Sequence, residues 1–270
     1  MSAEQPETEV DAPSALTGVR LLVADPELGY ELAEDELEEA QPLVVLPSVE
    51  LEEGPFKLKE LQTADGVSGR LHGFLVLDGS LTINLDISGR TATRMIGNGG
   101  LVLLDGMETD SIPIRWGWAV QTPARLALLD ERMLRMACRW PPLLIAVFRR
   151  AAQLTRQGIL QQAISQLPRV EERLLALFWS IADRQGVVRA DGVWVELTAT
   201  HDDLAHMIGA QRPTVSLGLA RLAESGLCVS EPSGWLIHPD SRDQFPLRVS
   251  ADDGADDVAD DEATGASVGS

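Results

Sequence analysis

The chain has 270 residues, a hydrophobic content of 44% and a formal net charge of −20 at pH 7. This length allows one large or two modest domains, each with a real core. No apolar run approaches the ~20 residues that a helix needs to cross a bilayer, so we expect no membrane partner. The acidic balance argues against binding of nucleic acid through overall charge, since a basic footprint is the usual sign of such proteins.

The first residues of the chain and the spacing of its cysteines indicate the cellular compartment. The N-terminus lacks the basic region followed by an apolar stretch that marks a secretory signal. Cys138 and Cys228 lie far apart without CxxC spacing, so we expect both to be buried, reduced side chains. Because an iron–sulfur cluster needs about four such ligands, we expect none. Together these features predict a cytoplasmic protein.

Both ends of the chain are acidic. Residues 1–15 contain two prolines and few large apolar side chains, and we expect them to be disordered. Residues 241–270 are expected to form an acidic disordered tail, because the part from Asp252 onward has no aromatic residue and no repeating apolar face. Such a tail is typically a solvated element; the alternative is an autoinhibitory segment that mimics DNA phosphate.

Residues 16–130 are predicted to form a domain made mostly of strands. The clearest predicted hairpin joins 73–77 to 81–85 through Asp78, Gly79 and Ser80. Short strands at such spacing favour a barrel or a sandwich, and the acidic run at 31–39 fits a helix or a loop equally well. The other predicted turns and strands are 87–91, 95–104, and a last pair at 116–120 and 124–129.

Residues 131–166 are predicted to contain a linker and one long helix, which begins at Pro141 or Pro142 and runs to about Ser165. Parts of its apolar set have near-heptad spacing, which favours pairing with another helix, although Gly158 weakens the pattern. The alternative is a helix packed wholly on its own domain. The apolar positions are Leu143, Leu144, Val147, Ala151, Leu154, Ile159, Ala163 and Ile164.

The most informative pattern lies at 200–226, where two short helices are predicted around a glycine turn. Thr200 can cap the first helix with Asp203 at the third helical position, and Gly209 supplies the bend. The second helix is predicted to begin at Gln211 or Arg212, with a proline tolerated in its first turn. Its core-facing positions are Val215, Leu219 and Leu222, and Gly226 is its predicted C-cap.

The flanks of this helix pair complete a larger motif. An amphipathic helix follows Pro168, and a short strand is predicted at 193–197. Strands at 227–230 and 235–238, joined by a turn, form a hairpin after the second helix. The order helix, strand, helix, turn, helix and hairpin is that of a winged helix-turn-helix over residues 167–240.

A recognition helix would need specific side chains on its outer surface. Arg212 lies at the N-terminal end, where it can pair with guanine or phosphate, and Leu217 can contact a thymine methyl. Hydroxyls and the free amides of the first turn can donate to phosphate. The alternative is a helical hairpin whose polar residues are merely solvated. The predicted DNA-contacting residues are Thr200, Gln211, Arg212, Thr214, Ser216, Leu217 and Arg221.

Two runs in the C-terminal part of the chain carry a family resemblance. The two runs are LPRVEERLLALFWSIADRQG and LTATHDDLAHMIGAQRPTVSLGLARLAESGLC. They resemble the C-terminal DNA-binding domain of the Crp/Fnr family of bacterial transcription regulators. Leu217 stands where many members carry a base-reading arginine and Pro213 where many carry glutamate, so the operator should differ from the best-known family consensus.

The resemblance implies an architecture and a function. It implies an α+β fold with an N-terminal β-roll (cupin-like and cyclic-nucleotide-binding-like), a long dimerisation helix and a C-terminal winged helix-turn-helix. It also implies a homodimer that binds a palindromic operator in double-stranded DNA, with RNA polymerase as a further partner. A protein-interaction module with a degenerate winged helix is the alternative, because the segment 167–240 holds more acids than arginines.

The region expected to hold a ligand departs from the family pattern. Members that bind cyclic nucleotide use a Gly-Glu pair and an Arg-Ser or Arg-Thr pair, and GNGGLVLLDGMETDSIPIRWGW has neither. Arg115 is the only nearby cation in the sequence. The neighbouring acids that would repel a phosphate are Asp105, Glu108 and Asp110.

We therefore expect a degenerate pocket, no cyclic nucleotide and no cofactor. Trp116, Trp118 and His72 can line a cavity for another effector, although packing in the core is the favoured interpretation. The sequence has no pair of histidines placed as axial ligands of heme. It also lacks the HExxH, GxSxG and P-loop motifs and any metal-spaced Cys/His cluster, so none of these indicates an enzyme. Much of the acidity lies in the first 65 residues and after Ala251, and 209–223 contains two arginines and no acid, so the field at the contact surface matters more than the total charge.

Overall fold

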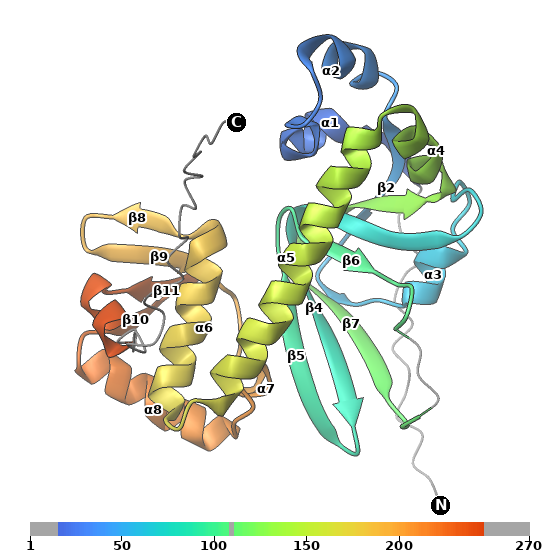
Figure 1. Ribbon diagram of the computed structural model, residues 1–270. Helices are drawn as coiled ribbons and strands as arrows, with labels where there is room; N and C mark the ends of the chain where they lie inside the picture. The colour runs from blue at the N-terminus through green and yellow to red at the C-terminus, as the bar shows by residue number, and fades with distance from the viewer. Residues whose placement is uncertain (1–15, 108–110, 246–270) are drawn as a thin grey trace, which may run out of the picture.

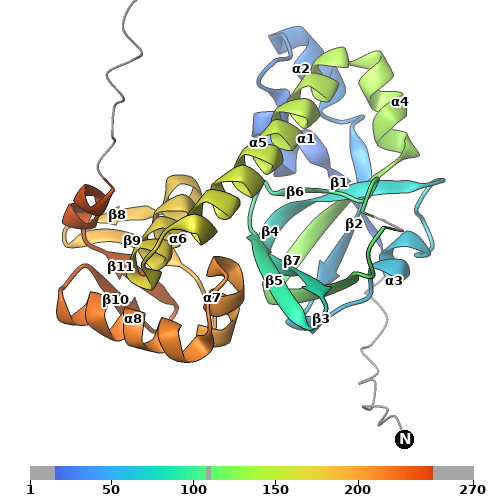
Figure 2. The ribbon, with the colours of Figure 1, turned by 60° about the horizontal axis from the view of Figure 1, so that its bottom comes forward.

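The computed structural model describes residues 16–107 and 111–245. An N-terminal unit of antiparallel strands is joined by the long helix α5 (Pro141–Gln166) to a C-terminal unit of helices and a small sheet (Figure 1). The second view shows α5 running from one unit to the other (Figure 2). None of the helices in the described ranges has the length and hydropathy needed to cross a bilayer.

Seven strands form the N-terminal sheet, and short helices cover its edges and one face. The sheet runs in the order β1-β2-β7-β4-β5, with β3 paired to β7 and β6 paired to β4. The strands are β1 (Thr17–Arg20), β2 (Val45–Leu51), β3 (Gly54–Pro55), β4 (Leu71–Ile87), β5 (Arg90–Ile96), β6 (Leu101–Leu103) and β7 (Arg115–Asp130). The helices are α1 (Leu21–Ala24), α2 (Glu34–Ala40), α3 (Leu58–Gln62) and α4 (Glu131–Arg139), with a 3-10 turn at Pro26–Gly29. Most of helix α2 thus lies in the undecided acidic run at 31–39.

Two predicted hairpins are wrong, because β4 and β7 are single long strands that pair with each other along most of their length. Gly79 has φ 76° and lies in a bulge where the register shifts, so the chain bends there without reversing. A bulge and a tight turn both use a glycine with positive φ, and for this reason the local sequence does not separate them. The true hairpin joins β4 to β5 through Ser88 and Gly89, within the predicted turn at 87–91.

Side chains of β4 alternate between two separate cores. Phe74 and Val76 pack inside the roll with Trp118, whereas Leu75 packs on the opposite face. That opposite core also contains Leu143 of α5. Both faces of the sheet are therefore buried around 73–76, which is why the first part of β4 has a nearly continuous apolar sequence.

Helix α5 contributes apolar side chains to the cores of both units. Leu143 is fully buried in the N-terminal unit, and Ile164 is buried in the core of the C-terminal unit. Val147, Ala151 and Leu154 pack partly against the N-terminal core. Much of the near-heptad set noted in the sequence therefore packs on the chain's own domain.

The two cysteines differ in exposure, which corrects the prediction that both are buried. Cys228 is 1% exposed, whereas Cys138 is exposed on α4. Met133 and Ala137 form the buried face of α4 at i and i+4, and Cys138 lies one residue beyond that face.

The C-terminal unit is a winged helix, as predicted. Its sheet runs in the order β10-β11-β9-β8, and Phe178 of α6 stacks on Trp235 of β11 with ring centroids 4.9 Å apart. Strand β8 was not predicted, because its three residues are all exposed and show no alternation. The elements are α6 (Val170–Gln185), β8 (Val187–Arg189), β9 (Gly192–Glu196), α7 (His201–Ile208), α8 (Arg212–Glu224), β10 (Cys228–Glu231) and β11 (Gly234–Ile237), followed by a 3-10 turn at Pro239–Gln244.

Candidate DNA-binding surface

Local hydrogen bonds fix the start and the end of α7. The Thr200 hydroxyl accepts the N–H of Asp203 at 3.1 Å, and the Asp203 carboxylate accepts the N–H of Thr200 at 2.9 Å. This reciprocal pair is the predicted capping box. Gly209 then adopts φ 64°, a left-handed conformation that turns the chain toward α8 at little steric cost.

Helix α8 begins at Arg212, with Gln211 as its N-cap, and packs closely on α6. A Cβ at the buried Gly218 would lie 3.2 Å from the side chains of Leu174 and Val170, so only glycine allows this approach without displacement. The predicted inward positions Val215, Leu219 and Leu222 are all buried. Gly226 follows the helix with φ 69°, as expected for a glycine C-cap.

Four of the seven predicted contact residues lie open on the outer surface of α8 or at its cap. These four are exposed and form no side-chain hydrogen bond within the described ranges: Gln211, Arg212, Thr214 and Leu217. Leu217 is 52% exposed, which is a high fraction for a leucine in a folded domain. An arginine at the first helical position and an uncovered apolar residue one turn later are suited to contact base edges.

The other three predicted contact residues already have partners within the domain. The Thr200 hydroxyl donates to Asp203 at 2.7 Å, and the Ser216 hydroxyl donates to the carbonyl of Arg212 at 3.1 Å. Arg221 donates to the Glu171 carboxylate of α6 at 2.7 Å. These groups would have to exchange an existing hydrogen bond for one to DNA, which lowers the net gain.

The first turn of α8 offers fewer free amides than expected. Pro213 has no N–H, and the N–H groups of Thr214 and Val215 both donate to the carbonyl of Gln211, at 2.9 and 3.0 Å. Helix termini otherwise leave their first N–H groups available to anions. The backbone contribution to phosphate binding is therefore small at this helix.

Two neighbours of the surface were missed by the sequence analysis. His201 lies at the first position of α7 and its Nδ1 is 2.8 Å from the Ser216 hydroxyl, which links the two helices. Glu171 faces α8, and its pKa is lowered, mainly by the hydrogen bond from Arg221. Residues at separations of 15 and 50 in the sequence carry no local pattern that could have indicated these contacts.

Acidic side chains limit the positive field around the helix pair. Residues 169–241 contain six arginines, no lysine and ten acidic residues. Asp202 and Asp203 occupy the first turn of α7, and Glu171 offsets the charge of Arg221. Arg212 is thus left as the α8 arginine without a carboxylate partner in the described ranges.

A cavity of about 570 Å³ lies between the N-terminal sheet, α5 and α7. Its mainly apolar lining includes Leu85, Trp116, Leu154 and Met207. The expectation of core packing is therefore wrong for Trp116, which is 39% exposed, and confirmed for Trp118, which packs edge-on against Phe74 with centroids 5.9 Å apart.

The region expected to hold a phosphate in cyclic-nucleotide binders has a different arrangement. Asp105 pairs with Arg70 and with His72, and its pKa is lowered chiefly by the hydrogen bond with His72. Arg115 is highly exposed and pairs with Asp86 at 3.4 Å. The carbonyl of Gly99 in the glycine turn accepts a hydrogen bond from Arg150 of α5 at 2.7 Å, a cation that the local sequence did not reveal. Glu108 and Asp110 lie outside the described residues.

Comparisons with known proteins agree with this geometry. Residues 169–241 match the family model of the Crp-like helix-turn-helix domain. Comparison with curated protein sequences gives no match. The solved structures below are all less than 20% identical to this chain, and their likeness concerns the fold.

Three of these structures illustrate the likeness. A CooA mutant from Carboxydothermus hydrogenoformans has a TM-score of 0.58 at 17% identity, covering 84% of this chain and 95% of that one. A cyclic nucleotide-binding domain containing protein from Listeria monocytogenes has a TM-score of 0.59 at 13% identity, covering 82% and 99%. A CRP family transcriptional regulator from Thermus thermophilus has a TM-score of 0.51 at 18% identity, covering 70% and 91%.

The fold and the C-terminal site define a class of protein, namely a β-roll joined by a long helix to a winged helix-turn-helix. Residues 169–241 belong to the Crp-like helix-turn-helix domain family, and the chain as a whole shares the fold of solved structures such as the CooA mutant and the CRP family regulator. The predicted α+β fold is thereby confirmed.

Proposed function

We propose that this protein binds a palindromic operator in double-stranded DNA as a homodimer, without control by cyclic nucleotide, and regulates transcription in the cytoplasm together with RNA polymerase. The observation that carries the proposal is the outer surface of α8, where Arg212, Thr214 and Leu217 are exposed at the N-terminal half of a helix whose opposite face is buried. Phosphate contacts position such a helix and base contacts give its specificity.

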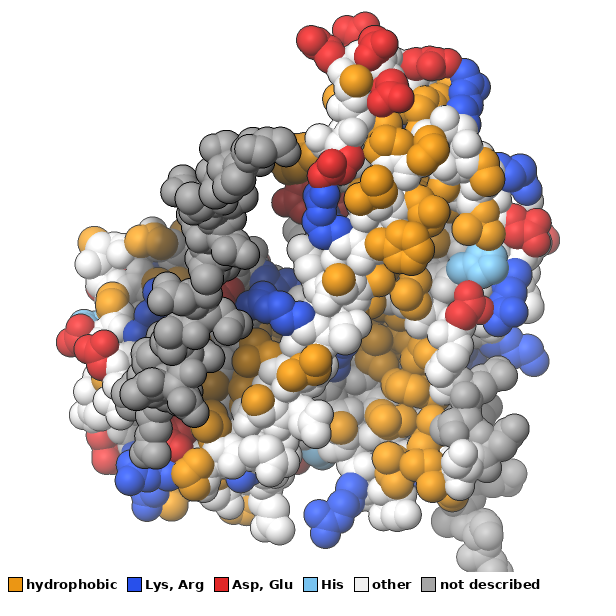
Figure 3. All heavy atoms as spheres, viewed as in Figure 1, with side chains coloured by type: hydrophobic (Ala, Val, Ile, Leu, Met, Phe, Trp, Pro, Cys, Tyr) orange, Lys and Arg blue, Asp and Glu red, His pale blue; other side chains and the backbone are white. Residues whose placement is uncertain are grey.

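The exposed side of α5 supports the dimeric part of the proposal. Ile145, Phe148, Ala152, Thr155 and Ile159 follow each other at spacings of three and four residues, which is the seam of a coiled coil. Phe148 and Ile159 are each 64% exposed, and hydrophobic side chains cluster over α5 and the adjoining strands in Figure 3. In helix-turn-helix dimers the two recognition helices lie about one DNA turn (~34 Å) apart, and the proposed dimer would present two copies of α8 in this way.

Selection of DNA sequences by the full-length protein tests the operator. We expect an enriched palindrome, and Arg212→Ala should weaken its binding by about 1–3 kcal/mol and relax the preference at one base position per half-site. Arg70→Ala, which removes an exposed arginine of the N-terminal unit, is the matched control. If no sequence is enriched at low salt, the outer surface of α8 is better explained as a protein-binding face.

Sedimentation of the purified protein tests the dimer. Phe148→Glu places a charge in the seam at an exposed position, so it should give folded monomers that bind a half-site weakly. Val188→Glu is the control, because Val188 is 83% exposed on β8 and lies off the seam. A wild-type protein that sediments as a monomer at every concentration would refute this part of the proposal.

A further inference from the structure

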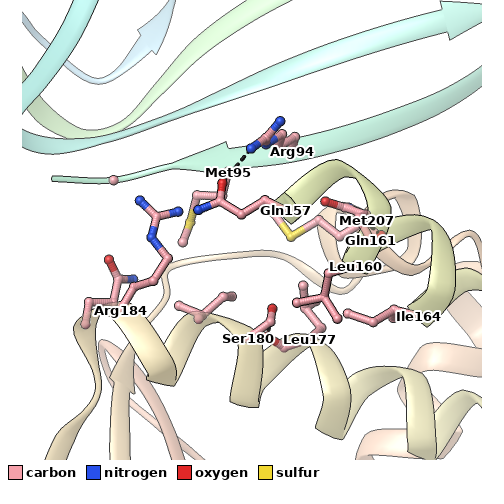
Figure 4. Close-up of a pocket in the computed structure, with 13 residues that line it drawn as sticks. Arg94, Met95, Gln157, Leu160, Gln161, Ile164, Leu177, Ser180, Arg184 and Met207 are labelled. Carbon is pink, nitrogen blue, oxygen red and sulfur yellow. Dashed lines mark hydrogen bonds between the residues drawn. The ribbon is translucent and has the colours of Figure 1, made fainter. Parts of the chain in front are cut away.

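A small pocket with both apolar and polar lining lies where the two units of the chain meet. It is lined by residues of β5, α5 and α6, including Arg94, Gln157 and Arg184, and encloses about 70 Å³. Figure 4 shows the side chains of Arg94 and Arg184 directed toward the pocket from β5 and α6, with Gln157 between them in this view. A cavity needs only ~10–15 Å³ of such volume for one water, so this one has room for a small ion.

The two arginines of this pocket lack a counter-charge. Neither Arg94 nor Arg184 forms an ion pair with a carboxylate in the described ranges. Asp25 and Glu27 already have another partner, because they bind Arg150 at 3.0 and 2.7 Å. Asp183, the neighbour of Arg184, faces Arg242 on the other side of α6, at 3.6 Å.

Removal of water makes this arrangement unfavourable when the pocket is empty. Burial lowers the pKa of Arg94, and the nearby charge of Arg184 lowers it further. Partial burial likewise lowers the pKa of Arg184, with a further contribution from Arg150, although Arg184 is exposed and Arg94 is half-buried by surface area. A partly desolvated charge without a partner costs some free energy, although less than a fully buried one does.

The donors around the pocket suit an anion. Arg94 donates to Oε1 of Gln157 at 2.5 Å and to the carbonyl of Leu154 at 3.4 Å, so the amide N–H groups of Gln157 remain free to donate. The hydroxyl of Ser180 is already donated to the carbonyl of Leu177 at 2.7 Å. Guanidinium groups are the preferred protein ligands for phosphate-type oxyanions.

We propose that Arg94, Arg184 and Gln157 form a binding site for a small oxyanion of the phosphate class at the junction between the β-roll and the winged helix. The anion bridges β5 to α6 and replaces the repulsion between the two arginines by attraction. It therefore holds the DNA-binding unit in a fixed position on the N-terminal unit. This site is separate from the outer surface of α8 and does not depend on the proposed operator binding.

Calorimetric titration of the full-length protein with inorganic phosphate, in chloride buffer of constant ionic strength, tests the site. We expect saturable binding of one phosphate per chain and a rise in the thermal midpoint with phosphate. Arg94→Gln and Arg184→Gln should each weaken binding about tenfold or more, as expected for loss of a charge-assisted hydrogen bond. Arg184→Lys, which keeps the charge, should lose less.

Control variants make the outcome decisive. Arg189→Gln, five residues further on, removes an arginine that pairs with Glu231 at 2.9 Å, and it should bind phosphate as the wild type does. Absence of saturable binding to the wild type overturns the proposal. Binding that survives Arg184→Gln but disappears in Arg212→Ala would place the phosphate on the DNA-binding surface and would also overturn it. Because Arg94 links β5 to α5, Arg184→Gln is the deciding variant if Arg94→Gln fails to fold.

Discussion

Replacing Glu171 with glutamine tests whether Arg221 is held away from DNA by its own domain. The pair spans 2.7 Å between α8 and α6, with the Arg221 side chain 60% exposed and that of Glu171 24% exposed. An exposed ion pair of this kind contributes about 0.2–1 kcal/mol, because solvent screens it. The wild-type protein must break the Arg221–Glu171 pair before Arg221 can contact DNA, whereas the Glu171→Gln variant has already lost it. The affinity for DNA should therefore rise by up to about fivefold per protomer, and by up to about 25-fold for a dimer with two half-sites.

The salt dependence of binding provides a second, independent measurement. Each phosphate contact adds ~0.9 to the slope of log K against log salt, so one new contact per protomer should steepen the slope of a dimer by about 1.8. Fluorescence anisotropy with the selected operator between low and physiological salt measures both quantities. The loss of folding stability should stay within ~1 kcal/mol, because Glu171 lies in the first turn of α6 near its surface.

The matched control is Glu39→Gln, which changes the net charge equally but releases Arg139 of α4, far from the recognition helix in sequence and in the fold. If Glu171→Gln binds the operator no more tightly than this control and has the same salt slope, Arg221 serves to anchor α8 on α6. The reasoning that counts it among the DNA contacts would then be refuted.

Three further predictions concern the stability and chemistry of the fold. At pH 8 the native protein should react with Ellman's reagent at one thiol, that of the exposed Cys138, and at two thiols after denaturation, because burial raises the pKa of Cys228 to about 12. The ordinary pKa of a cysteine thiol is 9.0, so the unfolded chain loses this proton first, and the free energy of unfolding in urea melts should fall as pH rises above about 9. Asp130→Ala should lower the free energy of unfolding by about 2–4 kcal/mol in urea denaturation, because its fully buried carboxylate accepts the N–H of Ser68 and two hydrogen bonds from Arg132; a loss below 1 kcal/mol would contradict this account. Gly218→Val should lower the free energy of unfolding by about 1–3 kcal/mol by overpacking against α6, and it should weaken operator binding at temperatures where the protein remains folded. Unchanged melting and binding would show that the α6–α8 contact is loose.

The sequence by itself determined the elements whose signals are local. The capping box at Thr200, the left-handed Gly209 and the buried period of α8 depend on residues within a few positions of each other, so the helix-turn-helix could be predicted with its limits. The exposed state of Arg212 and Leu217 follows from the same period, because the core-facing residues fix the opposite side of the helix.

The tertiary structure decided whatever depends on partners distant in the sequence. Gly79 bends a strand where a hairpin was predicted, because both halves of β4 find their hydrogen bonds on β7 rather than on each other. Arg221 meets Glu171, and Arg94 shares a pocket with Arg184, across separations that leave no pattern in the chain. Burial and charge pairing are set by the packing of whole elements, so the availability of a candidate side chain for DNA or for an anion becomes defined only when the fold is complete.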